Sequence, residues 1–87
     1  MPTVSRFFGI AIYVYRFDHG VPHFHARYGD QQASIAMDDS RVLGGDLSPR
    51  ALRLVQEWSL AHRPELMHVW QQAQTAEDRL DQIEPLR

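Results

Sequence analysis

The sequence predicts an α+β fold, with a three- or four-stranded antiparallel sheet followed by two amphipathic helices packed on one face of the sheet. The first half of the chain alternates apolar and polar residues with a period of two, and turn residues separate the alternating runs. From residue 48 onward the apolar residues recur at helical spacing instead. A chain of 87 residues is long enough for one modest core, so we expect a single domain over residues 1–87.

The composition is that of an ordinary globular protein, with 44% apolar and 23% charged residues. The absence of cysteine excludes disulfide bonds and thiolate chemistry. No apolar run is long enough for a membrane span and no signal-peptide pattern is present, so we expect a cytoplasmic protein without a membrane partner. The net charge of -2 argues against coating of nucleic acid through bulk electrostatics. All nine basic residues are nevertheless arginine, which can bind phosphate in two places.

Three alternating runs and one shorter run define the expected strands. Residues 7–17 are rich in β-branched and aromatic side chains, which favours one central strand that ends near Asp18. Residues 23–28 alternate cleanly, and Gly29 with Asp30 makes a tight turn to a third strand over residues 32–38. Residues 41–43 are expected to form a short edge strand, with the two glycines that follow ending the sheet.

Two helices are expected after the sheet. Ser48 is a good N-cap, and Pro49 is suited to the first helical position. Pro64 interrupts the helical pattern and can begin a second helix. The residues predicted to face inward are Ala51, Leu54, Val55, Trp58 and His62 in the first helix and Leu66, Val69, Trp70 and Ala73 in the second. The closing residues 83–86 are predicted to be extended and to dock on the domain through Ile83 and Leu86.

Residues 18–30 contain the candidate functional site. Three of the five histidines fall within seven residues, bracketed by Asp18 and Asp30. On an alternating strand the even-numbered residues 24, 26 and 28 face the core, while His23, His25 and Arg27 stand together on the opposite face. The Cα atoms of two residues at i and i+2 lie roughly 6.5–7 Å apart, so both imidazoles can act on one ligand.

The same residues are compatible with three kinds of site. In a metal-independent ribonuclease, His23 and His25 would act as base and acid while Arg27 neutralises the phosphate. His19 and Asp18 would complete that catalytic set. In a metal-binding protein or metal-dependent hydrolase, His19, His23 and His25 would bind a divalent ion, with Asp18 orienting them. In a non-enzymatic binding module, antitoxin-like or regulatory, the polar sheet face would contact another protein, and no cofactor would be needed.

Four stretches of the chain resemble one protein family. They are the opening residues 1–10, the motif Pro22-His23-Phe24-His25-Ala26 with Asp18 and His19 before it, the helical residues 50–52 and 57–58, and the closing residues 83–86. On these motifs the chain resembles the bacterial domain-of-unknown-function family 4160, although Val21 replaces the first proline of the family's usual Pro-Pro-His-Phe-His.

The resemblance implies a DhiT-like toxin of a toxin–antitoxin pair, encoded beside a second small protein that is its cognate, antitoxin-like partner. The ribonuclease hypothesis, with RNA as the substrate, rests instead on the strand face that carries His23, His25 and Arg27. Exposed sheet edges would also allow a homodimer.

Overall fold

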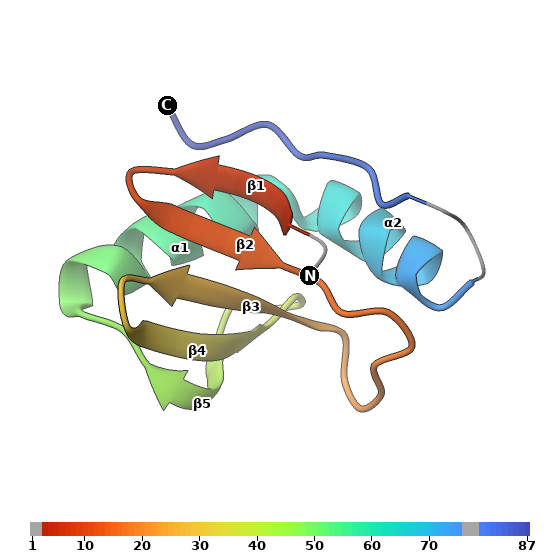
Figure 1. Ribbon diagram of the computed structural model, residues 1–87, viewed down its shortest axis with the longest axis horizontal. Helices are drawn as coiled ribbons and strands as arrows, with labels where there is room; N and C mark the ends of the chain where they lie inside the picture. The colour runs from red at the N-terminus through yellow and green to blue at the C-terminus, as the bar shows by residue number, and fades with distance from the viewer. Residues whose placement is uncertain (1–2, 76–78) are drawn as a thin grey trace.

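The computed structural model describes residues 3–75 and 79–87. In these residues five strands precede two helices, which confirms the predicted α+β fold with more strands than the three or four expected. The strands are β1 (Thr3–Phe7), β2 (Ile10–Tyr13), β3 (His23–Tyr28), β4 (Gln31–Ala36) and β5 (Val42–Asp46), and the helices are α1 (Pro49–Ala61) and α2 (Arg63–Ala73). The strands form one antiparallel sheet in chain order, with α1 behind it and α2 continuing past its end (Figure 1).

The prediction of one strand over residues 7–17 was wrong, because β1 and β2 form a hairpin that turns after Phe7. β1 pairs with β2, and Phe7 lies opposite Ile10. Phe8 and Gly9 form the two-residue turn, with φ angles of 50° and 80°. Positive φ at both central positions is typical of a type I′ hairpin turn. The bulky Phe8 concealed this turn in the sequence, because such residues rarely adopt positive φ.

The sheet continues further along the chain than the sequence indicated. β3 occupies the predicted residues, and Tyr28 pairs with Gln31 across the predicted two-residue turn. β5 begins and ends later than expected and includes Gly44 and Gly45, which therefore do not end the sheet. Its pairing register with β4 shifts beside Ser34, as in a β-bulge. Gly45 opposes Ala33 there, so a residue without a side chain allows close approach of the two strands.

The core lies between the sheet and the helices, with Trp58 of α1 at its centre. The Trp58 side chain is fully buried, and its ring centroid lies 5.3 Å from that of Phe7 and 5.8 Å from that of Phe24. Ser48 caps α1 as predicted, because its hydroxyl oxygen accepts a hydrogen bond from the Ala51 backbone N at 3.3 Å. The four predicted inward residues of α2 are all buried. No helix of the described residues is long and apolar enough to cross a membrane.

The C-terminal tail docks on the domain, as predicted. Ile83 is buried, and its backbone N donates to the Val4 carbonyl oxygen at 2.8 Å. The Trp58 indole N–H donates to the Glu84 carbonyl oxygen, also at 2.8 Å. The tail therefore runs along the outer side of β1 and links the sheet edge to α1 (Figure 1).

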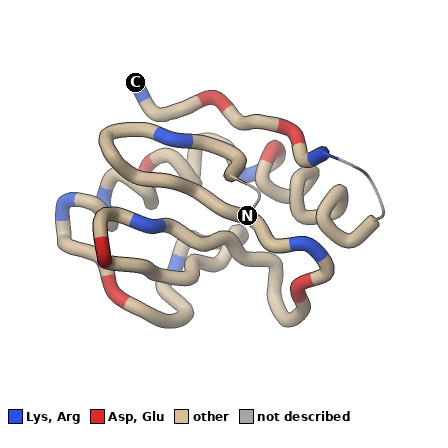
Figure 2. Tube along the Cα trace, in the orientation of Figure 1, with Lys and Arg blue, Asp and Glu red and all other residues tan. Residues whose placement is uncertain are grey.

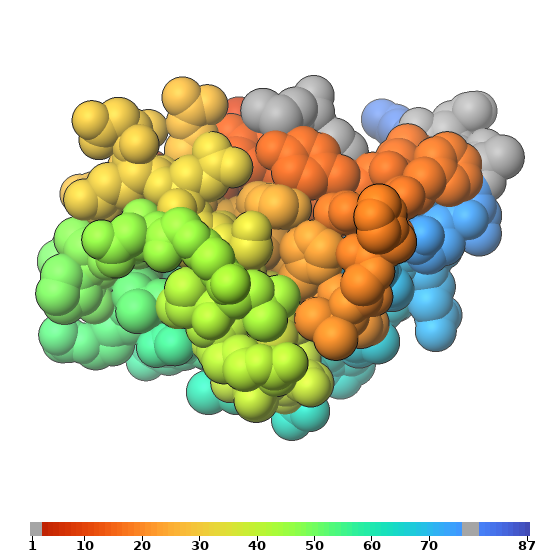
Figure 3. Space-filling view, turned by 90° about the horizontal axis from the view of Figure 1, so that it is seen from below, coloured from red at the N-terminus to blue at the C-terminus, as the bar shows by residue number. Residues whose placement is uncertain are grey.

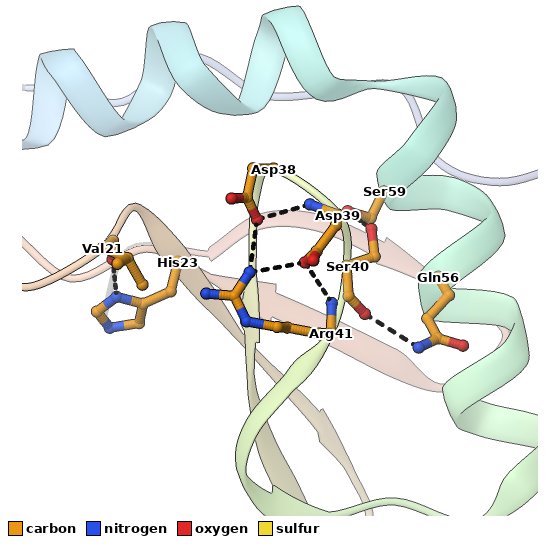
Figure 4. Close-up of polar contacts among 8 residues, drawn as sticks. All are labelled: Val21, His23, Asp38, Asp39, Ser40, Arg41, Gln56 and Ser59. Atoms are coloured by element: carbon orange, nitrogen blue, oxygen red, sulfur yellow. Dashed lines mark hydrogen bonds and ion pairs between the residues drawn. The ribbon is translucent and has the colours of Figure 1, made fainter.

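The turn between β4 and β5 is fixed to α1. Ser40 is buried with a φ angle of 63°, and its hydroxyl donates to the Ser59 hydroxyl at 2.7 Å. The Gln56 side-chain amide donates to the Ser40 carbonyl oxygen at 3.0 Å (Figure 4). These contacts hold the end of β4 next to the beginning of β3, where the Met37 backbone N donates to the Pro22 carbonyl oxygen at 2.9 Å.

Candidate functional site

The candidate residues lie where the loop of residues 14–22 enters β3. The loop is tied to α2, because the Phe17 backbone N donates to the Ala73 carbonyl oxygen at 2.8 Å. Phe17 has a φ angle of 55°, which is unusual for a bulky residue and indicates that its surroundings impose the conformation. In the space-filling view, the orange atoms of this region lie between the yellow-green β4–β5 turn and blue α2 (Figure 3). The site is thus at the end of the sheet, beside α2.

Asp18, His23 and His25 form a compact group, the Asp-His-His cluster. The Asp18 Oδ2 atom lies 2.9 Å from His23 Nε2 and 3.7 Å from His25 Nε2. One potential ligand atom from each of the three residues lies within 4.8 Å of the other two. The side chains of His23, His25 and Asp18 are 13%, 14% and 25% exposed. The structure therefore brings two imidazoles and a carboxylate together in a largely buried position.

Each histidine of the cluster is oriented through its Nδ1 atom. His23 Nδ1 lies 2.7 Å from the Val21 carbonyl oxygen (Figure 4), and His25 Nδ1 lies 3.2 Å from the Ser34 hydroxyl oxygen. A carbonyl oxygen only accepts hydrogen bonds, so His23 Nδ1 carries a proton. Its Nε2 atom faces a second acceptor, the Asp18 carboxylate. Both contacts are favourable only if the ring is doubly protonated or if another cation lies between Nε2 and Oδ2.

The Nε2 atom of His25 is buried and has no hydrogen-bond partner within the described part of the chain. Its 3.7 Å separation from Asp18 Oδ2 is too long for a hydrogen bond. Leaving a buried polar atom unpaired costs about 1–3 kcal/mol, so such atoms in folded proteins require an explanation. This atom points toward the same carboxylate oxygen as His23 Nε2.

Two aromatic side chains enclose the histidine rings. The Tyr15 ring meets His25 edge-on with centroids 4.4 Å apart, and the Trp70 ring lies 5.3 Å from that of His23. The sequence indicated Trp70 only as a core residue of the second helix and Tyr15 only as a strand residue. The Trp70 contact could not be inferred from local spacing, because α2 reaches the site only through the packing of the whole domain.

The surroundings of the cluster lower the pKa values of His25 and Asp18, for different reasons. The pKa of His25 is lowered chiefly by burial and further by the charge of His23, and the nearby Asp18 only partly offsets this. Burial acts to raise the pKa of Asp18, but the hydrogen bond from the His19 backbone N–H and the contacts with both imidazoles together lower it. At neutral pH the cluster therefore contains an ionised carboxylate and a neutral His25.

We expect the His25 ring of metal-free protein to titrate below its usual pKa of about 6.5. Because folding lowers this pKa, His25 contributes stability above about pH 6.5, and that contribution is lost as the pH falls through the folded-state value. The substitution His23→Gln removes the neighbouring positive charge and should move the His25 pKa upward. NMR titration of the imidazole protons after chelator treatment measures both values, and an unchanged His25 pKa in the variant would contradict the expected coupling.

His19 and Arg27 lie outside the cluster. The His19 side chain is exposed, and the residue contacts Asp18 through its backbone N, which donates to Oδ1 at 3.0 Å. Arg27 is exposed on the same strand as the histidines, and its Nε donates to the Gly29 carbonyl oxygen at 3.3 Å, toward the β3–β4 turn. Among the described residues, the three groups placed to hold a metal are Asp18, His23 and His25. The third potential ligand is therefore Asp18, whereas the sequence predicted His19.

Figure 2 shows that positively and negatively charged residues are interspersed along the chain. At the β4–β5 turn, for example, the Arg41 guanidinium lies 3.1 Å from an Asp38 carboxylate oxygen and 3.0 Å from one of Asp39. The backbone N–H and guanidinium of Arg41 lower the pKa of Asp39 despite some opposing desolvation. Recognition of an anion at the site would therefore depend on local groups more than on the overall field.

The fold and the site define a small α+β protein with an Asp-His-His centre at the junction of a loop and a sheet. The chain belongs to the family described as domain of unknown function (DUF4160), whose model matches residues 9–71. The match includes all three residues of the cluster and confirms the family resemblance found in the sequence. No curated protein and no solved structure matches the chain.

Proposed function

We propose that this protein is the toxin-like component of a bacterial two-protein module and that it cleaves phosphodiester bonds of RNA at the Asp-His-His cluster. The observation that carries this proposal is the convergence of two imidazole Nε2 atoms on one carboxylate oxygen. The resemblance to DhiT-like toxins supports the cellular role and implies a cognate antitoxin-like partner encoded nearby, and we propose that the protein acts in the cytoplasm.

The chemistry of RNA cleavage fits the residues of the cluster. Attack of the 2′-hydroxyl on the phosphodiester requires a proton acceptor, a proton donor and positive charge near the phosphate. A neutral His25 can accept a proton, and His23, with acceptors at both ring nitrogens, is placed to carry positive charge. The exposed Arg27 guanidinium on the same strand can contact the phosphate. A bound metal ion could replace the proton-transfer groups in the same reaction.

Induced expression in bacteria tests this function. We expect the parent protein to arrest growth and the His23→Ala/His25→Ala variant, expressed at the same level and shown to be folded by circular dichroism, to permit growth. Total RNA from the same cultures should be cut only where the parent is expressed. His68→Ala makes the same chemical change on an exposed position of α2 and should arrest growth like the parent.

Two results would contradict the proposal in different ways. Growth arrest by the double variant would place the active site elsewhere in the protein. Normal growth of cells that contain abundant soluble parent protein would contradict the toxin assignment itself.

A protein-binding role is the second candidate, and the exposed edge of the sheet favours it. Val42 and Leu43 on β5 are 41% and 42% exposed. An edge strand with exposed apolar side chains can add a strand from a partner. Partner binding that depends on these two residues, with no turnover of RNA by the parent, would support this role over the ribonuclease.

A further inference from the structure

We infer that the Asp-His-His cluster binds one divalent transition-metal ion through Asp18 Oδ2, His23 Nε2 and His25 Nε2. The inference concerns the same site as the proposed function and names its cofactor, but the binding itself can be measured without any activity. It is derived from three features of the cluster: the orientation of the rings, an unpaired buried atom and the distances between the three ligand atoms.

The first feature is the orientation of the His23 ring. Its Nδ1 atom donates to the Val21 carbonyl oxygen, so a neutral ring has its lone pair on Nε2. That lone pair is directed at a carboxylate oxygen 2.9 Å away, and two acceptors at this distance repel each other unless a cation lies between them. A histidine with Nδ1–H bound to a carbonyl and Nε2 free is the form that most often ligates a metal.

The second feature is the buried Nε2 atom of His25, which has no hydrogen-bond partner in the described residues. A proton shared between His23 and Asp18 would satisfy that pair and leave the His25 atom unpaired. A metal ion bonded to all three residues provides a partner for every one of these atoms. The Ser34 hydroxyl at His25 Nδ1 can fix the ring orientation, as groups behind metal ligands commonly do.

The third feature is the spacing of the ligand atoms. Imidazole nitrogens and carboxylate oxygens bind zinc at about 2.0–2.2 Å, which puts two ligands of one ion roughly 2.8–3.6 Å apart at bond angles between 90° and the tetrahedral value. The observed separations from Asp18 Oδ2 are 2.9 Å to His23 and 3.7 Å to His25. The first separation lies within that range, the second exceeds it slightly, and one ligand atom from each of the three residues lies within 4.8 Å of the other two.

The donor set also indicates which ions the site prefers. Two imidazoles and one carboxylate suit Zn²⁺, Mn²⁺, Fe²⁺ or Ni²⁺ better than Ca²⁺ or Mg²⁺, which prefer oxygen ligands. Three protein ligands leave at least one coordination position for water or substrate, as in catalytic zinc sites. A metal bound here would supply a hydroxide that can accept the proton of the attacking 2′-hydroxyl, and it would neutralise charge on the phosphate.

Metal titration of untagged protein tests the inference. After removal of metal with a chelator, isothermal titration with Zn²⁺ should give one saturable site per chain, and Co²⁺ in its place should develop visible absorption. We expect Asp18→Ala and His25→Ala each to lower the affinity at least tenfold. His19→Ala and His68→Ala serve as matched controls outside the cluster and should bind like the parent.

The possible outcomes separate this inference from the proposed function. Absence of saturable binding by folded parent protein would overturn the metal site, and loss of binding in His19→Ala but not in Asp18→Ala would overturn the ligand set. RNA cleavage that persists in chelator-treated protein would show a metal-independent ribonuclease and contradict the cofactor role. Stoichiometric binding that needs Asp18 and His25, in a protein that cleaves no RNA, would support the metal site and contradict the proposed function alone.

Discussion

Gly45→Ala is expected to destabilise the fold by about 2–4 kcal/mol, because the alanine would combine backbone strain with a steric clash. Gly45 has a φ angle of +77°, which is unfavourable for a residue with a side chain. A Cβ atom there would lie 2.2 Å from the Gln32 carbonyl oxygen and 2.9 Å from the Ala33 Cα atom. Both are backbone atoms of β4, so relief requires the two strands to separate.

The neighbouring Gly44 provides a matched control on the same strand. A Cβ atom at Gly44 would meet no atom within 4 Å, and the residue does not require positive φ. We expect Gly44→Ala to change the free energy of unfolding by less than about 0.5 kcal/mol or to stabilise slightly. Urea denaturation of the parent and both variants measures the difference. Equal midpoints for parent and Gly45→Ala would show that β5 does not require a glycine at this position.

The same substitution is expected to affect the candidate site, because β5 pairs with β4 beside Ser34. Ser34 lies opposite Gly44, and its hydroxyl orients His25 through Nδ1. A displaced β5 should therefore alter the NMR signals of the His25 ring in Gly45→Ala protein under conditions where the variant remains folded. No such change should occur in Gly44→Ala.

The features that the sequence predicted correctly are those determined by residues close together in the chain. The alternation of residues 23–28 gave the bounds of β3 and placed His23 and His25 on one side of it. Ser48 followed by proline identified the beginning of α1, and the spacing from Leu66 to Ala73 identified the buried side of α2. In each case the determinant is the period of the element or a hydrogen bond within one helical turn.

The features that the sequence did not reveal depend on tertiary packing or on unusual backbone conformations. The β1–β2 turn places a phenylalanine at positive φ, contrary to the usual preference for glycine or asparagine. Asp18 and His19 are adjacent in the chain, and the path of the loop, tied to α2 at Phe17, directs Asp18 rather than His19 toward the histidines. The contact of Trp70 with His23 likewise requires α2 to pass the end of the sheet.

Asp18→Asn is expected to lower the rate of RNA cleavage by about 10²–10⁴-fold, the range typical for loss of acid–base catalysis, because the Asp18 carboxylate either binds the metal or stabilises the protonated His23 ring. Asparagine has nearly the same shape as aspartate, and its side-chain oxygen can still accept the hydrogen bond from the His19 backbone N–H. The substitution removes the negative charge that faces His23 Nε2 at 2.9 Å. Purified protein and a labelled RNA measure the rate, and circular dichroism checks the fold.

Asp81→Asn is the matched control, because it makes the same change at an exposed carboxylate that pairs with His68 away from the cluster. Its cleavage rate should equal that of the parent, and an unchanged rate in Asp18→Asn would contradict a role for the cluster. The zinc affinity of Asp18→Asn then separates the two mechanisms. If affinity and cleavage fall together, Asp18 acts as a ligand of the catalytic metal. If only cleavage falls, its carboxylate acts by stabilising the protonated His23 ring.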